Sequence, residues 1–260
     1  SIKTRINSLM WDDATRFYHD LDKDGNRLNE KTIAGFWPLL AEIPNADKAE
    51  LLISHLNDPE TFGTDHPFPT LSADSKSFKK MGEGFCGSVF PAFNFMVVKG
   101  LEKYRHYELA RECSIRHLYY ILEGLMPNDP KEKGDVYEAY LPTKEGKASM
   151  SKDASFPRPY YLITVGLSTI ALMIENVIGL SISFPRKTVD WIIPNLEVMG
   201  IENLSLKRNL VTILSSKTQR GWEIHMESEK LYYFTINILG QKKKTLPIPS
   251  GKCSMLIDKL

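Results

Sequence analysis

The chain has 260 residues, and its 33 Lys and Arg nearly balance its 32 Asp and Glu, which leaves a formal net charge of +1. This balance excludes a general electrostatic attraction to nucleic acid or to an anionic membrane. An apolar content of 42% excludes an intrinsically disordered chain. Three cysteines without a CxxC pair give no support for a structural zinc site or a disulfide framework.

Apolar residues at helical spacing predict a helical domain over residues 1–180. Helices are predicted, in chain order, over 2–17, 30–42, 46–57, 91–103, 107–124 and 167–178. Two long polar loops, 58–81 and 126–159, lie between them, and long loops inside compact domains are often functional. The apolar stretch 160–184 is interrupted by Glu175 and Asn176, so we predict a buried helix there and not a membrane span.

After Gly179 the pattern changes to short alternating segments separated by turn residues, which predicts an all-β domain over residues 181–260. Strands are predicted over 196–198, 204–206, 210–214, 222–226, 231–236 and 254–257. Such a series is typical of an antiparallel β-sandwich. The basic run at 242–244 is predicted to form a solvated hairpin tip. The predicted fold class is therefore mainly α followed by β.

An acidic turn near the N-terminus resembles the start of an EF-hand calcium loop, because Asp20, Asp22 and Asp24 alternate before Gly25. Such a loop needs a bidentate carboxylate at its twelfth position, which is Lys31 here. A polar turn between two helices explains the pattern better than a calcium site, because Asp and Gly suit turn geometry.

Three loop motifs carry candidate chemistry. In His66-Pro67-Phe68-Pro69, the prolines fix a backbone that displays a histidine and an aromatic ring, as in the wall of a sugar site or in a loop packed on a core. The glycines of segment 82–91 permit close backbone approach but lack the Lys-Ser/Thr of a nucleotide loop, so a helix entry lined by Phe85 and Phe90 is the alternative. In segment 137–142, Glu138 lies between two tyrosines, where it is either a general base or a solvated carboxylate.

Taken in order, the segments MWDDATRFYHDLDKDG, GFWPLL, HPFPTLSAD, GFCGSVFPAFNFMVVKGL, YEAYLP and IENVIGL resemble the C-terminal half of the trehalase-like and glucosidase-like inverting glycoside hydrolases. This group includes the mannosylglycerate hydrolase and processing α-glucosidase families. The resemblance covers most of residues 5–180, and the β-rich remainder matches the usual C-terminal sandwich of these enzymes. It implies an (α/α)6 toroid, of which this chain supplies about half.

The resemblance also implies site residues. The family base lies in a Glu-x-Tyr motif, which falls on Glu138 with Tyr140 beside it. The family's pocket-lining helix entry falls on segment 84–90 and its Pro-Phe-Pro-Ser loop on segment 67–70. The implied substrate-binding residues are Tyr140, Phe85, Gly87, Phe90, His66 and Phe68. The chain departs from the family where two pocket tryptophans are Phe85 and Phe90 and where an arginine is Cys86.

In inverting enzymes a second carboxyl group protonates the leaving oxygen. The family's general acid lies upstream of the segment that begins this chain, and Asp12 and Asp13 belong to a different motif. The predicted function is therefore part of an inverting glycoside hydrolase that cleaves α-linked glycosides. The alternative is a non-catalytic carbohydrate-binding or scaffold protein derived from the same fold.

The predicted partners are an oligosaccharide or α-glycoside, and either a missing N-terminal segment or a second copy of the chain. One of these would cover the apolar helix surfaces of a half-toroid, for which Ile6, Leu9 and Trp11 are candidates. No cofactor, metal, nucleic acid or membrane is expected. Polysaccharide breakdown favours a periplasmic or secreted location.

Overall fold

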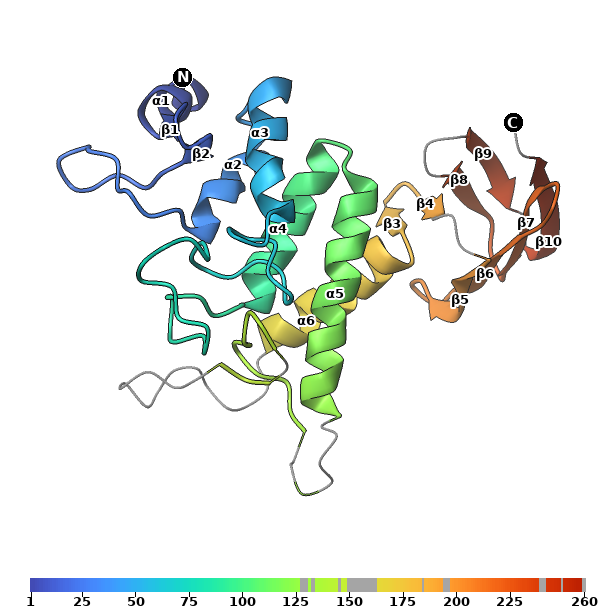
Figure 1. Cartoon of the computed structure of the whole chain (residues 1–260). Coiled ribbons are helices and arrows are strands. Elements are labelled where there is room, and N and C mark those ends of the chain that lie inside the picture. The colour runs from blue at the N-terminus through green and yellow to red at the C-terminus, as the bar shows by residue number, and fades with distance from the viewer. Residues whose placement is uncertain are drawn as a thin grey trace. The chain divides into compact units, whose positions relative to one another are not determined.

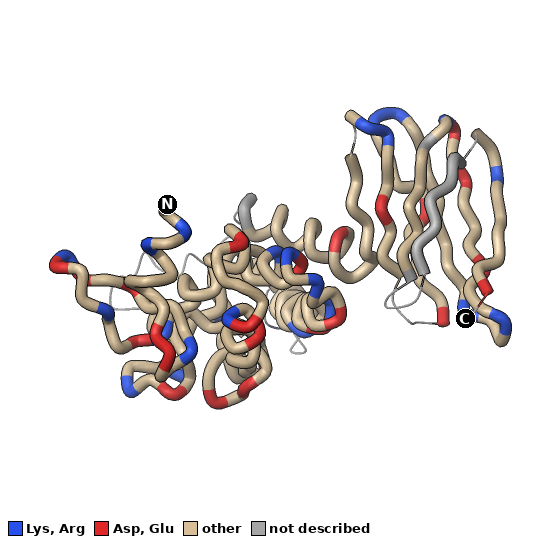
Figure 2. The backbone as a smooth tube through the Cα atoms, turned by 90° about the horizontal axis from the view of Figure 1, so that it is seen from above, with Lys and Arg blue, Asp and Glu red and all other residues tan. Residues whose placement is uncertain are grey.

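Figure 1 shows the computed structural model of the chain, which describes residues 1–126, 131, 134–144, 146–148, 163–183, 185–193, 197–238, 242–248 and 250–258. The chain divides into two compact units, Ser1–Leu172 and Met173–Leu260. Each unit has a large buried apolar core of its own. Figure 2 shows acidic and basic residues interspersed along the described backbone of both units.

The first unit is built from helices and long loops. Its elements are α1 (Ile2–Leu9), β1 (Trp11–Asp12), β2 (Phe17–Tyr18), the 3-10 helix η1 (Ile33–Phe36), α2 (Trp37–Leu40), α3 (Ala46–Asn57), α4 (Pro91–Lys103), α5 (Tyr107–Leu125) and α6 (Ile163–Leu172). The helices predicted at 46–57, 91–103 and 107–124 are confirmed. Two of these helices have a start signal in the sequence. The Asn45 side chain caps α3 by accepting a hydrogen bond from the Lys48 N–H, and Pro91 lies in the first turn of α4.

The predicted helix over 2–17 is wrong beyond Leu9. The Asp12 carboxylate accepts a hydrogen bond from the Ala14 N–H at 3.1 Å, and Arg16 takes a left-handed φ of 56°, so the chain turns back between β1 and β2. Contrary to our prediction, Trp11 is therefore buried, at 5% exposed, with its ring edge-to-face on Tyr18. The helical pattern over 30–42 is likewise shorter than predicted, because only η1 and α2 form there.

Aromatic side chains from loops complete the core of the first unit. The Phe17 ring stacks on Phe62 at 5.6 Å and meets Phe36 edge-on at 5.2 Å. Gly35 lies so close to this cluster that an added Cβ would come within 2.2 Å of the Phe17 ring. The long loop after α3 is thus anchored in the core through Phe62, although its sequence looks polar.

The second unit begins with the π-helix η2 (Met173–Val177) and continues with two four-stranded sheets. Its strands are β3 (Leu180–Ser183), β4 (Thr188–Ile193), β5 (Val198–Ser205), β6 (Leu210–Lys217), β7 (Gly221–Ser228), β8 (Tyr232–Ile238), β9 (Lys242–Ile248) and β10 (Gly251–Asp258). One sheet has the order β3-β4-β8-β9 and the other β10-β7-β6-β5. The prediction of wholly antiparallel sheets is wrong at one place, because β4 and β8 run parallel.

Alternating side chains give the second unit one core shared by both sheets. Trp222, Ile224 and Met226 point inward from β7, and Trp191 and Phe234 do so from the other sheet. Strands β3, β4 and β9 were not predicted. Residues 242–244 open β9 and do not form a hairpin tip, because they pair with the end of β8.

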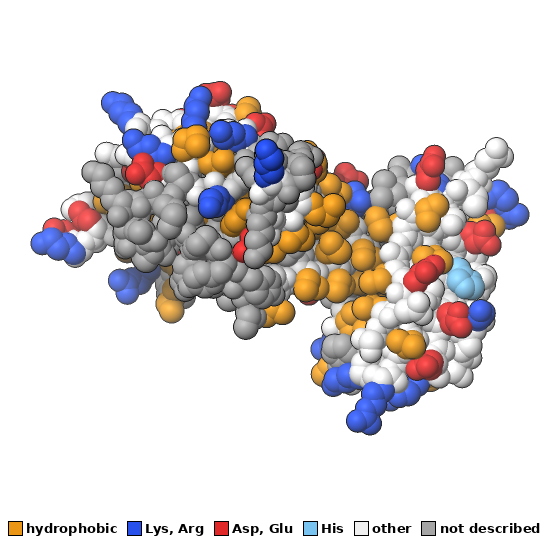
Figure 3. All heavy atoms as spheres, turned by 90° about the horizontal axis from the view of Figure 1, so that it is seen from below, with side chains coloured by type: hydrophobic (Ala, Val, Ile, Leu, Met, Phe, Trp, Pro, Cys, Tyr) orange, Lys and Arg blue, Asp and Glu red, His pale blue; other side chains and the backbone are white. Residues whose placement is uncertain are grey.

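Helices α5 and α6 carry apolar side chains on an exposed face. These are Ile115, Tyr119 and Leu122 on α5 and Met126 at its C-cap, which are 38 to 70% exposed and recur with helical spacing. We call these four residues the α5 stripe. On α6, Leu167 and Ile170 are 60% and 55% exposed, so the prediction of a fully buried helix is wrong. Figure 3 shows apolar side chains gathered on one face of the helical unit.

Within the described part of the chain, no helix combines the length and the apolar character that crossing a bilayer requires.

Candidate functional site

The segment that carries Glu138 is held on both sides by backbone hydrogen bonds. Tyr140 and Val89 exchange two N–H···O bonds of 2.9 Å, and the Ala148 N–H donates to the Ala139 carbonyl at 3.0 Å. Glu138 directly precedes these two bonded residues and is 9% exposed. Tyr140 is fully buried, and burial raises the pKa of its hydroxyl well above the ordinary value.

Further backbone hydrogen bonds join the Val89–Tyr140 pair to two other loops. We call the row Ile33, Thr70, Ser88, Val89 and Tyr140 the ladder. The Ile33 N–H donates to the Thr70 carbonyl and the Thr70 N–H to the Ser88 carbonyl, both at 2.9 Å. Val89, the next residue, pairs with Tyr140. The ladder thus connects the long loop after α3, the glycine-rich loop and the Glu138 segment, which lie far apart in the sequence.

The glycine-rich loop displays an aromatic ring. Phe85 is 64% exposed, and its ring stacks on Phe90 at 5.4 Å and lies 6.5 Å from that of Phe93 on α4. Phe90 is 7% exposed and belongs to the same small core cluster as Ala139, the neighbour of Glu138. Gly87 takes a φ of 125°, and a Cβ there would lie 2.9 Å from the Lys79 carbonyl oxygen, so only glycine fits.

His66 lies in a buried polar cluster underneath this arrangement. Its Nε2 is 2.7 Å from His117 Nδ1, its Nδ1 is 3.2 Å from the Leu141 carbonyl, and its ring stacks on Tyr120 at 4.6 Å. The Asn94 amide nitrogen lies 3.0 Å from His117 Nδ1 and 2.5 Å from the Pro67 carbonyl. The cluster therefore ties α4 and α5 to both loop segments.

Burial keeps both imidazoles of this cluster uncharged. Desolvation lowers the pKa of His117 to about 3, and desolvation with the neighbouring His117 lowers the pKa of His66 well below its ordinary value. A neutral His66 ring has one N–H, so it donates either to His117 or to the Leu141 carbonyl. Among the described residues, His117 Nε2 and Asn94 Oδ1 are buried without a hydrogen-bond partner.

Acidification is expected to destabilise the first unit. The pKa of His117 is about 3 when folded against 6.5 ordinarily, so between these values the unfolded chain binds a proton that the folded chain excludes. Unfolding free energy should then fall by about 1.4 kcal/mol per pH unit as the pH drops through this window. Denaturant unfolding at about pH 7 and about pH 5 measures the slope. His117→Gln should reduce this slope without abolishing it, because burial also keeps His66 uncharged. An unchanged slope in His117→Gln would contradict the assignment.

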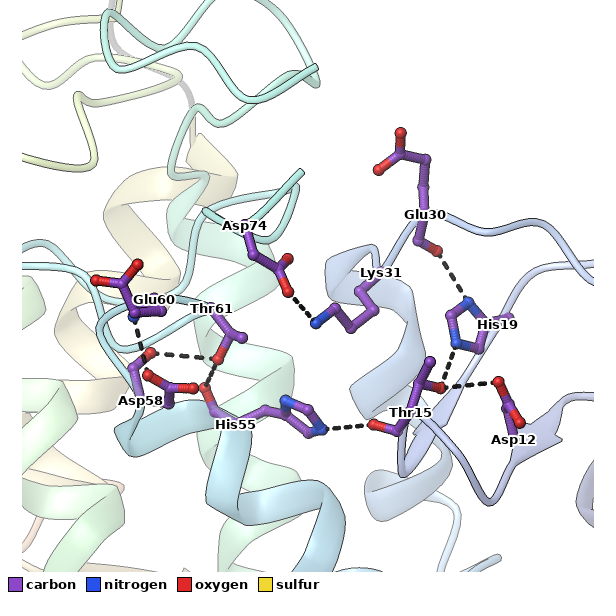
Figure 4. A network of polar contacts seen from close by, with 10 residues as sticks. All are labelled: Asp12, Thr15, His19, Glu30, Lys31, His55, Asp58, Glu60, Thr61 and Asp74. Atoms are coloured by element: carbon purple, nitrogen blue, oxygen red, sulfur yellow. Dashed lines mark hydrogen bonds and ion pairs between the residues drawn. The ribbon is translucent and has the colours of Figure 1, made fainter. Parts of the chain in front are cut away.

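Figure 4 shows a second polar network, which fixes the N-terminal hairpin. Thr15 Oγ1 lies 2.7 Å from His19 Nε2 and donates to Asp12 Oδ2 at 3.2 Å, while the Thr15 carbonyl lies 3.0 Å from His55 Nε2 on α3. Lys31 pairs with Asp74 in the same network. Asp12 is thus engaged in holding the turn, and Asp13 accepts a hydrogen bond from the Trp11 indole at 2.6 Å.

The acidic turn uses its carboxylates internally. Asp22 Oδ1 accepts hydrogen bonds from the Asp24 and Asn26 N–H groups, both at 2.9 Å, and these contacts with Asn26 foremost lower the pKa of Asp22. Among the described residues, no three His, Cys, Asp or Glu side chains come together as a metal ion would require. The geometry is that of a polar turn.

The structure thus brings Glu138, Tyr140, Phe85, Gly87 and Phe90 onto adjoining segments. His66 and Phe68 lie in the interior of the first unit, where their side chains are as fully buried as that of Tyr140. Sequence reasoning gave no role to three residues that support the site, namely Phe93, Asn94 and His117, and it placed Thr70 only as the last residue of the loop 67–70. A signal existed for two of them, because Phe93 and Asn94 follow Phe90 by three and four positions and so share its helix face.

Two family models match the chain. The model of the mannosylglycerate hydrolase MGH1-like glycoside hydrolase domain matches residues 1–153, and that of the trehalase C-terminal domain matches residues 179–260. An uncharacterized protein of Borreliella burgdorferi is 55% identical over 261 residues, which are the whole of this chain and 55% of that protein. The chain therefore spans about half the length of this curated relative.

Solved structures also resemble the chain. A sialidase matches 89% of this chain with 22% of its own, at a TM-score of 0.64 and 15% identity, a likeness of fold alone. The GH63 mannosylglycerate hydrolase of Thermus thermophilus, in complex with Tris, matches 56% of this chain with 33% of its own, at a TM-score of 0.48 and 25% identity.

Proposed function

Because this chain belongs to the MGH1-like glycoside hydrolase family, we propose that it contributes the general base of an inverting hydrolase that acts on α-linked glycosides. The base is Glu138. The observation that supports this assignment is the position of Glu138, which is 9% exposed and lies on a segment held by backbone hydrogen bonds. The next residue, Ala139, packs in one cluster with Phe90, on which the exposed Phe85 ring stacks.

In the proposed mechanism Glu138 removes a proton from a water molecule as that water attacks the anomeric carbon. The leaving oxygen receives a proton from a carboxylic acid on the opposite side of the sugar, supplied by a part of the protein outside these residues. The exposed Phe85 ring stacks against the apolar face of the sugar with Phe90 packed behind it, and Tyr140 keeps the Glu138 segment in place through its buried ring.

We further propose that the helical unit forms part of an (α/α)6 toroid, completed by a helical segment outside these residues. The 55% coverage of the Borreliella relative and the exposed α5 stripe support this. The second unit is proposed to form the sandwich that accompanies the toroid in trehalase-like enzymes.

Product stereochemistry tests the mechanism. Water attacks from the face opposite the leaving group, so the sugar whose anomeric carbon is attacked should be released first as its β-anomer by the protein as its host makes it. Trehalose and mannosylglycerate, the substrates that the matched family descriptions suggest, are the first probes, and proton NMR of the anomeric signals within the first minutes resolves the two anomers. Mannosylglycerate should give β-mannose first, whereas trehalose should give α- and β-glucose in equal amounts, because its leaving sugar keeps the α configuration. First appearance of α-mannose, or of α-glucose alone from trehalose, would contradict an inverting reaction.

A second candidate function is sugar binding without turnover. The exposed Phe85 ring, stacked on Phe90 and Phe93, favours it, since an aromatic face holds a sugar without any acid or base. Cys86 also stands where the family has an arginine. This reading predicts saturable binding of the same sugars by calorimetry with no free sugar released, an outcome distinct from either anomer.

A further inference from the structure

The Thr70 side chain connects the loop after α3 to the loop that displays Phe85. Its hydroxyl donates to the Phe85 carbonyl at 2.9 Å and accepts from the Gly87 N–H at 3.1 Å. Thr70 itself is 3% exposed, whereas Phe85 is 64% exposed. A buried hydroxyl therefore satisfies the backbone on both sides of Cys86 and fixes the turn from which the exposed ring projects.

The position of Thr70 is itself determined by its surroundings. Its N–H and C=O belong to the ladder with Ser88 and Ile33. Two residues earlier, Phe68 is buried with a left-handed φ of 59°, a conformation that costs free energy for a bulky residue and persists only when neighbours hold it. The Asn94 amide supplies one such contact, at 2.5 Å from the Pro67 carbonyl. The hydroxyl is thus presented from a rigid support.

We propose that Thr70 is a positioning residue for the sugar-stacking ring of Phe85, so that its hydroxyl controls the affinity for the sugar without taking part in bond cleavage. The inference rests on the proposed function of Phe85 as a sugar contact. The two backbone groups that Thr70 satisfies lie outside the ladder, so loss of the hydroxyl changes the Phe85 turn and not the Glu138 segment.

Two matched variants isolate the hydroxyl. Thr70→Val keeps the volume and the branched shape but leaves the Phe85 carbonyl and the Gly87 N–H without their partner, whereas Thr70→Ser keeps the oxygen. With trehalose and mannosylglycerate as probes, calorimetry on the protein as its host makes it should show about tenfold weaker binding for the Val variant, because both buried hydrogen bonds that fix the Phe85 turn are lost. The Ser variant should bind within about threefold of wild type, and kcat should change by less than about threefold in both.

A double-mutant cycle with Phe85→Ala shows whether Thr70 acts through the ring. If it does, Thr70→Val combined with Phe85→Ala binds the sugar no more weakly than Phe85→Ala alone. Additive losses, equal losses in the Val and Ser variants, a loss confined to kcat, or no binding of either sugar by the wild type would overturn the proposal. Because the probes are also the proposed substrates, binding is compared in the Glu138→Gln background, whereas kcat is measured with Glu138 present. A change in affinity then stands apart from the product anomer, which tests the proposed mechanism.

Discussion

Replacing Glu138 with Gln is expected to lower kcat by about 10³-fold, within the range that general base catalysis contributes. The amide has the size of the carboxylate but cannot accept a proton from water. The Glu138 segment should stay in place, because the bonds that hold it involve backbone groups of Ala139 and Tyr140. KM and the melting temperature should therefore change little.

Steady-state kinetics of the protein as its host makes it measure kcat and KM, and thermal unfolding measures the melting temperature. The matched control is Glu112→Gln, which makes the same chemical change on an exposed face of α5 and should leave kcat unaltered. A Glu138→Gln enzyme whose kcat stays within about threefold of wild type would remove Glu138 from the role of base.

The second large effect concerns the α5 stripe. α5 is apolar on two faces, since Ile121 and Leu118 are buried on one side while Tyr119 and Leu122 are exposed on the other. A helix with apolar residues on two faces normally packs against a neighbour on each of them. We expect the stripe to bind a helical segment from the part of the protein that corresponds to the uncovered portion of the Borreliella relative.

Co-expression provides the measurement. The chain and the uncovered portion of the relative, produced as two polypeptides, should elute together in size-exclusion chromatography with a mass of one copy of each. Leu122→Glu should weaken this complex by about 30-fold or more, because a charge would be buried at the contact centre. Val198→Glu, on a 68% exposed position of the second unit, should not affect it. A chain that instead pairs with itself through the stripe would contradict the choice of partner.

The helices of the first unit were predictable where one strong local signal decided the structure. The N-cap at Asn45 and the proline at position 91 mark the beginnings of α3 and α4 as the structure has them. The N-terminal hairpin was not predictable from periodicity, because Ile2, Ile6 and Leu9 continue in register toward Phe17. The turn depends on a hydrogen bond to the Asp12 side chain and on the burial of Trp11 against Tyr18. Neither contact changes the spacing of the apolar residues in the sequence.

The candidate site also has parts that were predictable from local sequence and parts that were not. The motifs around Phe85 and Glu138 were visible in the sequence, and their roles remain predictions. The ladder that joins them was not visible, since it links Thr70, Ser88 and Tyr140 across long loops without strand patterning. The burial of His66 was also not predictable. A histidine next to a Pro-Phe-Pro segment suggests an exposed side chain, and the sequence does not show that His117 packs against it.

The parallel pairing of β4 with β8 has a consequence for how the second unit folds. The chain leaves the first sheet after β4, builds β5 to β7 in the other sheet, returns for β8 and β9, and leaves again for β10. Neither sheet is made from one continuous stretch, so each must wait for pairings between distant parts of the chain. Folding rates decrease as such distant contacts come to dominate. The second unit should therefore refold slowly and in one cooperative step, and no single hairpin should be stable before both sheets have formed.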